Sequence, residues 1–156
     1  MRPSWNRESF LNGEGSGSKS FPPLPPANAF VLGSPTYYGQ PAGQLLSVWQ
    51  RVCFSAGRYI KGKVAASVAV CRRGGSTAAF QCLNMPFEML STVLIGSQYW
   101  NIVFGLDEGE CAKDSEGMQT MRTLGRNMAW VLKNLHREGA EPPPEPEAWQ
   151  GMHFIR

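Results

Sequence analysis

The sequence has few cysteines and histidines, the usual ligands of zinc and iron–sulfur clusters, and they are far apart. The cysteines form no Cys-x-x-Cys pair, and the two histidines are the residues that could join them as ligands: Cys53, Cys71, Cys82, Cys111, His136 and His153. This spacing does not indicate a zinc or iron–sulfur site, so we predict no metal. Free thiols are typical of reducing compartments, and we therefore expect the protein in the cytoplasm.

Long apolar runs and dense charge clusters are also absent. No segment approaches the roughly 20 apolar residues of a membrane span, and the amino terminus lacks the basic-then-apolar order of a signal peptide. The formal net charge of +3 comes from lysines and arginines spread along 156 residues. We therefore predict neither a membrane nor a nucleic acid as a partner. The absence of a G-x-G-x-x-G loop and of an acidic cluster at a strand end argues against Rossmann-type and response-regulator domains.

The composition divides the chain into three parts. Residues 1–28 are rich in Gly, Ser and Pro and predict a disordered or extended leader. Residues 136–156 contain Pro142, Pro143, Pro144 and Pro146 and predict an extended, proline-rich tail. The intervening residues 29–135 are long enough for one domain with a buried core.

Within this domain, apolar runs alternate with helical patterns. Residues 29–32, 63–70 and 92–95 predict strands, and residues 42–54, 77–90 and 114–135 predict helices. The first run has no polar residue, which predicts a strand buried on both faces. Ser76 is the expected N-cap of its helix, and Pro86 is expected to kink or end that helix. Trp49 and Trp130 are expected in the core. This order predicts a parallel, three-layer α/β fold.

Each predicted strand is followed by a loop whose groups can stack on a flat ligand or hydrogen-bond to it. The loops contain Gly33-Ser34-Pro35-Thr36-Tyr37-Tyr38-Gly39-Gln40-Pro41, then Cys71-Arg72-Arg73-Gly74-Gly75, then Ser97-Gln98-Tyr99-Trp100-Asn101. Ligands of open α/β sheets bind at the carboxyl ends of the strands, where such loops meet. The residues leave other readings open: Tyr37 and Tyr38 could pack on a neighbouring helix, Arg72 and Arg73 could be a solvated pair, and Cys71 could be redox-active or a buried, inert thiol.

The three loops, together with Gly117-Met118-Gln119-Thr120-Met121-Arg122-Thr123-Leu124-Gly125-Arg126-Asn127-Met128-Ala129-Trp130, resemble the NAD(P)H-dependent FMN reductase family of flavodoxin-like proteins. The resemblance covers about residues 29–135. It implies a flavodoxin-like fold that holds FMN, with NAD(P)H as co-substrate and a flavin, quinone or similar small molecule as electron acceptor. No side chain is implied as a catalyst, because the flavin carries the chemistry.

The resemblance also implies site residues. Ser34, Pro35, Thr36, Tyr37, Tyr38 and Gly39 would border the flavin ring and ribityl chain, while Cys71, Arg72, Arg73, Gly74 and Gly75 would cover the polar edge of the ring. Tyr99 and Trp100 would lie at the rim, where relatives often have a subunit contact, so we expect a homo-oligomer.

The chain departs from the family pattern at two places. The family begins with a strand, a phosphate-binding loop, a helix and a second strand, and residues 1–28 contain no such elements. We therefore expect an incomplete flavodoxin-like sheet of three core strands with helices on both faces. Phe104 stands where a histidine is common in relatives. The alternative function is that of a non-catalytic, truncated flavodoxin-like fragment that acts as an assembly or interaction module.

Overall fold

A computed structural model describes residues 27–148 of the chain. The predicted leader, residues 1–28, lies outside the described residues except for its last two. The predicted tail is described up to residue 148, and its residues 136–148 contain no helix or strand. No helix within the described range is long and apolar enough to cross a membrane.

The sheet has parallel strands at three places side by side, and a short antiparallel strand pairs with one of them. Its strands are β1 (Ala29–Tyr37), β2 (Gln40–Pro41), β3 (Val64–Cys71), β4 (Val93–Leu94) and β5 (Ile102–Phe104). β1 pairs in parallel with β3 along almost its whole length, from Ala29 opposite Val64 to Pro35 opposite Val70. β4 pairs with the start of β3 and β5 with its end, so both must lie on the side of β3 away from β1. β2 folds back on the end of β1.

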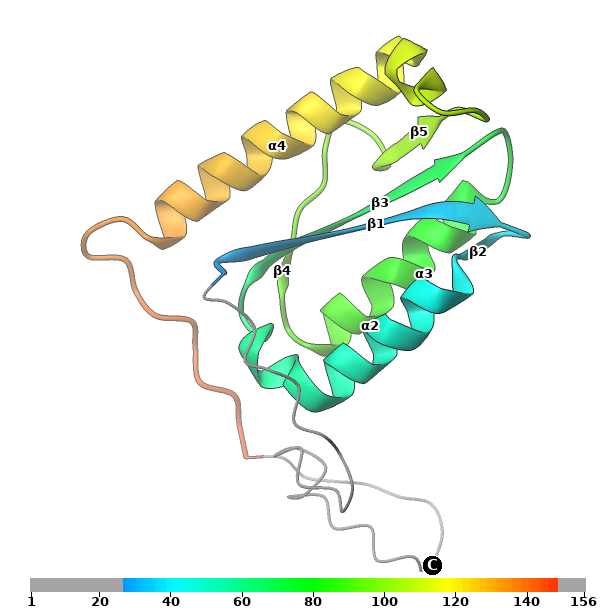
Figure 1. Ribbon diagram of the computed structural model, residues 1–156. Coiled ribbons are helices and arrows are strands. Elements are labelled where there is room, and N and C mark those ends of the chain that lie inside the picture. Colours follow the sequence, from blue (N-terminus) through cyan, green and yellow to red (C-terminus); the bar gives the residue numbers. More distant parts are fainter. Residues whose placement is uncertain (1–26, 149–156) are drawn as a thin grey trace, which may run out of the picture.

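Helices cover both faces of this sheet. α2 (Gly43–Ala56) and α3 (Ser76–Met89) lie on one face and α4 (Ser115–Leu135) lies on the other (Figure 1). Two short 3-10 helices, Gly57–Tyr59 and Glu110–Lys113, belong to the connections. The predicted three-layer α/β fold, with three core strands and helices on both faces, is confirmed for the described residues.

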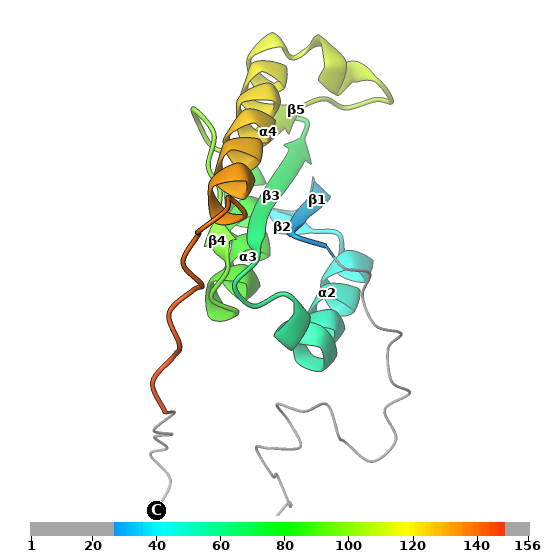
Figure 2. The ribbon, with the colours of Figure 1, turned by 90° about the vertical axis from the view of Figure 1, so that its left-hand side faces the viewer.

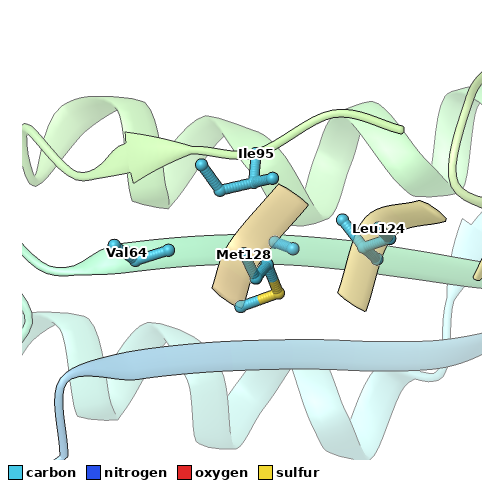
Figure 3. Packing of buried hydrophobic residues seen from close by; sticks show 5 residues of the cluster. Val64, Ile95, Leu124 and Met128 are labelled. Carbon is cyan, nitrogen blue, oxygen red and sulfur yellow. The ribbon is translucent and has the colours of Figure 1, made fainter. Parts of the chain in front are cut away.

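The core has one layer on each face of the sheet. Under α4, Val64 and Ile95 from the strand side meet Leu124 and Met128 from the helix (Figure 3). On the other face Trp49 of α2 packs on Phe87 of α3, with ring centroids 4.7 Å apart. Alternate residues of β3 face opposite layers, as the period of two in a strand requires. These two layers hold β3, the middle strand, in place.

The prediction that residues 29–32 are buried on both faces is wrong. Phe30 and Leu32 pack toward α2 and α3, but Val31 is 59% exposed. α4 lies over the β3 side of the sheet and leaves the same face of β1 largely uncovered (Figure 2). An apolar run therefore predicted the strand correctly but not how many helices cover it.

The structure also extends the predicted strands. β1 continues through Gly33 to Tyr37, because pairing with β3 continues to Pro35 and pairing with β2 involves Thr36 and Tyr37. β5 was not predicted at all. Its three residues contain too short a pattern to indicate a strand, and the end of β3 provides the pairing edge that forms it.

Three predictions about the helices need correction. The N-cap of α3 is Gly75, in the left-handed region at φ 86°, and Ser76 is the first residue of the helix. α3 does not end at Pro86 but continues to Met89. Trp130 is 68% exposed and is not in the core, since it lies on the side of α4 opposite Leu124 and Met128.

Candidate functional site

β1, β3 and β5 end side by side, so their carboxyl ends form one edge of the sheet, perpendicular to the strands (Figure 1). The turn between β1 and β2, the loop between β3 and α3, and the segments around β5 all lie there. The sequence predicted a binding site at this edge, because parallel strands bring their following loops together.

The turn between β1 and β2 presents two tyrosines to solvent. Tyr38 and Gly39 form a two-residue hairpin turn between Tyr37 and Gln40, with φ values of 50° and 77°. Two consecutive positive φ values are typical of a type I′ turn. Tyr37 is 60% exposed and Tyr38 is fully exposed, so neither ring is packed on a neighbouring helix. Both rings are therefore accessible to a ligand that stacks on them.

Ser34 and Pro35 connect this turn to the helix that follows. The Ser34 hydroxyl donates a hydrogen bond to the carbonyl oxygen of Pro35 at 2.8 Å and accepts one from the backbone N–H of Ala42 at 2.9 Å. Ser34 is buried, while Pro35 is exposed at the sheet edge. The Ser34 side chain therefore fixes the position at which α2 begins.

The turn between β1 and β2 touches the loop after β3, because Gly39 of the turn lies against Gly75 of the loop. We call these two glycines and the adjacent Thr36 the glycine junction. A Cβ atom on Gly75 would lie 2.8 Å from Cα of Gly39 and 3.5 Å from Cγ2 of Thr36. Such a close approach is possible because neither glycine has a side chain. The Thr36 hydroxyl oxygen is buried here with no hydrogen-bond partner among the described residues. A buried hydroxyl without a partner is unusual and identifies a polar position that a ligand could satisfy.

The loop after β3 combines one buried thiol with two exposed arginines. Cys71 is 5% exposed, and its carbonyl oxygen accepts a hydrogen bond from the N–H of Gly105 at 3.0 Å, which ties this loop to the end of β5. Arg72, Arg73 and Gly74 are exposed at the edge. The arginines can therefore meet an anionic or polar ligand, whereas the Cys71 side chain faces the protein interior.

A cleft of about 280 Å³ lies beside the glycine junction. It is bounded by the loop after β3, by the residues around β5 and by the first turns of α3 and α4. Its lining residues are Arg73, Gly74, Gly75, Ser76, Thr77, Tyr99, Trp100, Ile102, Phe104, Asp114, Glu116, Gly117 and Thr120. Of the predicted site residues, Arg73, Gly74 and Gly75 line this cleft. Residues 34–39 and Cys71 and Arg72 do not.

Aromatic rings form one side of this cleft. The rings of Tyr99 and Trp100 are 5.1 Å apart at an angle of 52°, and each is about half exposed or more. The Ser97 hydroxyl oxygen lies 2.6 Å from the carbonyl oxygen of Tyr99 and 2.7 Å from Oδ1 of Asn101, and its single proton is shared between these two acceptors, which holds the turn in shape. Tyr99 and Trp100 thus lie at the rim of the cleft, where an aromatic ligand could stack on them.

Asp114 joins the end of β5 to the start of α4. One carboxylate oxygen accepts a hydrogen bond from the N–H of Gly117 at 2.9 Å, and the other accepts one from the N–H of Phe104 at 2.8 Å. The first bond is an N-cap, which satisfies a free N–H of the first helical turn. Gly117 has no room for a Cβ, because that atom would overlap the Asp114 carboxylate and approach Cγ1 of Val103 to 3.1 Å.

We expect Asp114→Ala to lower the free energy of unfolding by about 2 kcal/mol, the upper end of the range for loss of an N-cap, because the Phe104 bond is lost as well. Urea denaturation followed by far-UV circular dichroism measures this change. Glu116→Gln is the matched control, since Glu116 lines the same cleft in the first turn of α4. It should change stability by about 0.5 kcal/mol or less. Equal losses in both variants would contradict the role given to Asp114.

Glu110, in the connection after β5, and Cys53, in the last turn of α2, have shifted pKa values. The N–H groups of Asp107 and Leu106 donate to the Glu110 carboxylate and lower its pKa, so the stabilisation is present at neutral pH and is lost as the pH falls through the folded-state pKa. Burial raises the pKa of the Cys53 thiol to about 11, which makes it a poor nucleophile. Within residues 27–148, no three His, Cys, Asp or Glu side chains are grouped so that they could hold a metal ion.

Sequence reasoning missed several residues of the cleft. Thr77, Ile102, Asp114, Glu116, Gly117 and Thr120 were not predicted as site residues. Asp114 was predicted only as the start of the last helix. No local pattern shows that the start of this helix lies beside the loop after β3, which is about 40 residues earlier in the sequence. The available signals were the parallel order of the strands and the motif of residues 117–130, which contains Gly117 and Thr120.

Comparison with known proteins places this arrangement in a family. Residues 24–107 match the profile of the family described as NADPH-dependent FMN reductase, which is more than half of the chain. The chain is 31% identical over 119 residues to an iron–sulfur flavoprotein of Methanocaldococcus jannaschii; the match covers 71% of this chain and 62% of that protein's length. The chain therefore spans less than two thirds of that relative.

A solved structure shows the same fold. The crystal structure of a flavodoxin, WrbA-like protein from Agrobacterium tumefaciens superposes with a TM-score of 0.54 and 21% identity, over 69% of this chain and 67% of that one. The flavodoxin-like fold expected from the motifs is confirmed. The family description also names FMN and NADPH, which are the cofactor and co-substrate that the motifs implied. The chain belongs to the NADPH-dependent FMN reductase family.

Proposed function

We propose that this chain carries the flavin-ring site of an FMN-dependent NAD(P)H oxidoreductase that passes hydride to a flavin, a quinone or a similar small molecule. The observation that carries the proposal is the glycine junction, where two strand-end loops meet over the unpartnered Thr36 hydroxyl. Family membership supports the same conclusion.

The residues at the junction fit a flavin ring. FMN presents a flat aromatic system with a polar pyrimidine end, and it needs stacking faces, hydrogen-bonding groups and close backbone approach. The exposed rings of Tyr37 and Tyr38 supply the faces, and Thr36 supplies a hydroxyl without a partner. Gly39 and Gly75 allow the backbone to approach closely. We assign the ring to residues 34–39 and 71–75, with Ser34 and Cys71 acting through the backbone because their side chains are buried.

The chain's own residues would position the reactants and stabilise charge. Bound FMN would supply the capacity to accept hydride from NAD(P)H and to donate it to an acceptor. Arg72 and Arg73, both exposed beside the junction, would stabilise negative charge on the pyrimidine end. Tyr99 and Trp100, at the rim of the neighbouring cleft, would orient a flat acceptor.

A flavin titration tests the proposal. FMN at about 1 μM should lose fluorescence as the protein is raised to roughly 50 μM, which corresponds to a Kd in the micromolar range. The protein–FMN mixture should then oxidise NADPH in the presence of a quinone. If FMN fluorescence stays unchanged throughout the titration, the proposal is wrong for this chain, and the alternative of a non-catalytic assembly or interaction module is favoured instead.

We also propose a homo-oligomer and a cytoplasmic location. All four thiols are free, as is typical of proteins in reducing compartments. Large apolar side chains that are exposed on the described surface, such as Val31 and Trp130, support self-association.

A further inference from the structure

The cleft between the starts of α3 and α4 has three walls that differ in chemistry. α3 and α4 begin at the same end of the sheet (Figure 1), and the residues before and within β5 form the third wall. The volume of about 280 Å³ is close to the lower limit for small-molecule sites. The three walls together restrict the kind of ligand that fits.

The wall formed by the start of α3 is suited to an anion. No side chain caps this helix, whose N-cap is Gly75, and its first turn contains no acidic residue. Its first N–H groups therefore have no partner within the helix and carry the positive end of the helix dipole. Arg73 precedes them, is exposed and lines the same cleft. A phosphate group at this wall meets backbone N–H groups and a guanidinium.

Two buried hydroxyl groups on this cleft have no protein partner. Ser76 is 5% exposed and Thr120 is 2% exposed, and both line the cleft. Ser76 begins α3 and Thr120 lies in α4, so they come from facing walls. In the part of the chain that the structure describes, neither hydroxyl makes a hydrogen bond. Side chains buried this deeply normally have partners, which the oxygen atoms of a ligand in the cleft would supply.

The wall formed by the start of α4 has one free carboxylate. Both oxygens of Asp114 already accept backbone N–H groups, from Gly117 and Phe104. Glu116 is exposed at the cleft and forms no hydrogen bond or ion pair with residues 27–148. A free carboxylate repels a bare anion but accepts hydrogen bonds from hydroxyl groups, as acidic residues do from ribose in dinucleotide-binding folds. A ligand with hydroxyl groups next to its anionic group fits both walls.

The third wall consists of aromatic rings. Tyr99, Trp100 and Phe104 line the cleft, and each is about half exposed or more. A flat base stacks well on such rings. An anionic group, hydroxyl groups and a flat base occur together in a nucleoside monophosphate.

We propose that this cleft binds a nucleoside monophosphate unit, and that in the proposed reaction this unit is the adenylate half of NAD(P)H. The phosphate lies at the start of α3, where its oxygens accept hydrogen bonds from free N–H groups, from Arg73 and from the Thr120 hydroxyl. The ribose hydroxyls donate to Glu116, and the base stacks on Trp100.

The cleft is next to the proposed flavin-ring site. Gly75 belongs both to the glycine junction and to the cleft lining, so the rest of the dinucleotide extends from the cleft toward the ring. Because hydride passes through the flavin, the aromatic wall serves the co-substrate first and the acceptor after the co-substrate has left. The assignment to NAD(P)H rests on the proposed function, whereas the binding of a nucleoside monophosphate does not.

Isothermal titration calorimetry with AMP, on the full chain without FMN, tests the cleft alone. AMP should bind with a Kd below about 1 mM. Adenosine and inorganic phosphate should each bind at least tenfold more weakly, because each leaves at least one wall without its partner. Phosphate that binds as tightly as AMP overturns the proposal, since the cleft is then an anion site only. Displacement of FMN by AMP overturns it too, because the flavin itself then fills the cleft.

Thr120→Val is the most specific variant, because it removes one cleft hydroxyl at nearly constant volume. It should weaken AMP binding about tenfold, the effect of losing a hydrogen bond to a charged group. Urea denaturation should show no loss of stability, because this hydroxyl has no partner among the described residues. Thr92→Val is the matched control. The Thr92 hydroxyl donates to the carbonyl oxygen of Phe87 at 2.9 Å, beside the start of β4 and away from the cleft, so AMP binding should be unchanged.

Two charge variants separate the two ends of the ligand. Arg73→Gln should weaken AMP binding at least tenfold, to the level of adenosine. Glu116→Ala should weaken AMP binding at least threefold and strengthen the binding of inorganic phosphate, because a repelling charge is gone. Undetectable binding of AMP at about 1 mM overturns the proposal, and so does unchanged AMP affinity in folded Thr120→Val and Arg73→Gln.

The AMP titration and the flavin titration give separate results. AMP binding without FMN binding leaves the nucleotide cleft in place and removes the proposed function of this chain. FMN binding without AMP binding removes the nucleotide cleft and leaves the flavin-ring site in place.

Discussion

Phe87→Ala is expected to lower the free energy of unfolding by about 3–5 kcal/mol, the cost of removing a fully buried phenylalanine. Phe87 is 0% exposed and packs on Trp49, so the truncation leaves a cavity between α2 and α3. Domains of this size are stable by only about 5–15 kcal/mol, so the change removes a large share of the total. Urea denaturation followed by tryptophan fluorescence measures it.

Met89→Ala is the matched control, because Met89 lies on the same helix two residues away and is 84% exposed. Its effect should stay within about 0.5 kcal/mol. A loss of less than about 1 kcal/mol for Phe87→Ala would contradict the packing of α2 and α3 on a shared core.

Gly75→Ala is expected to weaken FMN binding at least tenfold, because the added Cβ would lie 2.8 Å from Cα of Gly39. The neighbouring atom belongs to the backbone, so the hairpin turn must move. The left-handed backbone of Gly75, at φ 86°, adds strain of about 1 kcal/mol for any residue with a side chain. The flavin titration measures the affinity, and urea denaturation measures the stability of the same variant.

Gly96→Ala provides the comparison, since a Cβ at Gly96 would meet nothing within 4 Å and Gly96 lies outside the residues assigned to the flavin ring. It should bind FMN as the wild type does. If Gly75→Ala also binds FMN with unchanged affinity while remaining folded, the glycine junction is not the flavin-ring site, even if the chain binds flavin elsewhere.

Local patterns predicted the regular elements well where several signals agreed. The last helix was expected over residues 114–135, and α4 runs from Ser115 to Leu135 with Asp114 as its N-cap. An N-cap residue followed by an amphipathic stripe of apolar residues is a strong local signal. The second strand was expected over residues 63–70 and is observed as Val64–Cys71. Small and β-branched residues between two glycine-containing breaks predicted it.

Predictions failed where distant segments decide the outcome. Trp130 lies on a helix whose length was predicted, yet the side of α4 that meets the sheet is set by Leu124 and Met128 packing on Val64 and Ile95. β5 forms only because the end of β3 provides a pairing edge. Neither fact can be found within a short window of sequence.

By itself, the sequence determined the alternation of strands and helices, the family, and the loops that carry the candidate flavin residues, because these depend on local periodicity, turn chemistry and ordered motifs. Only the tertiary structure decided that Gly39 and Gly75 touch and that a cleft lies between the starts of α3 and α4. The physical reason is that contacts between segments depend on which faces the helices cover. The same apolar run forms a strand whether one face or both faces are covered.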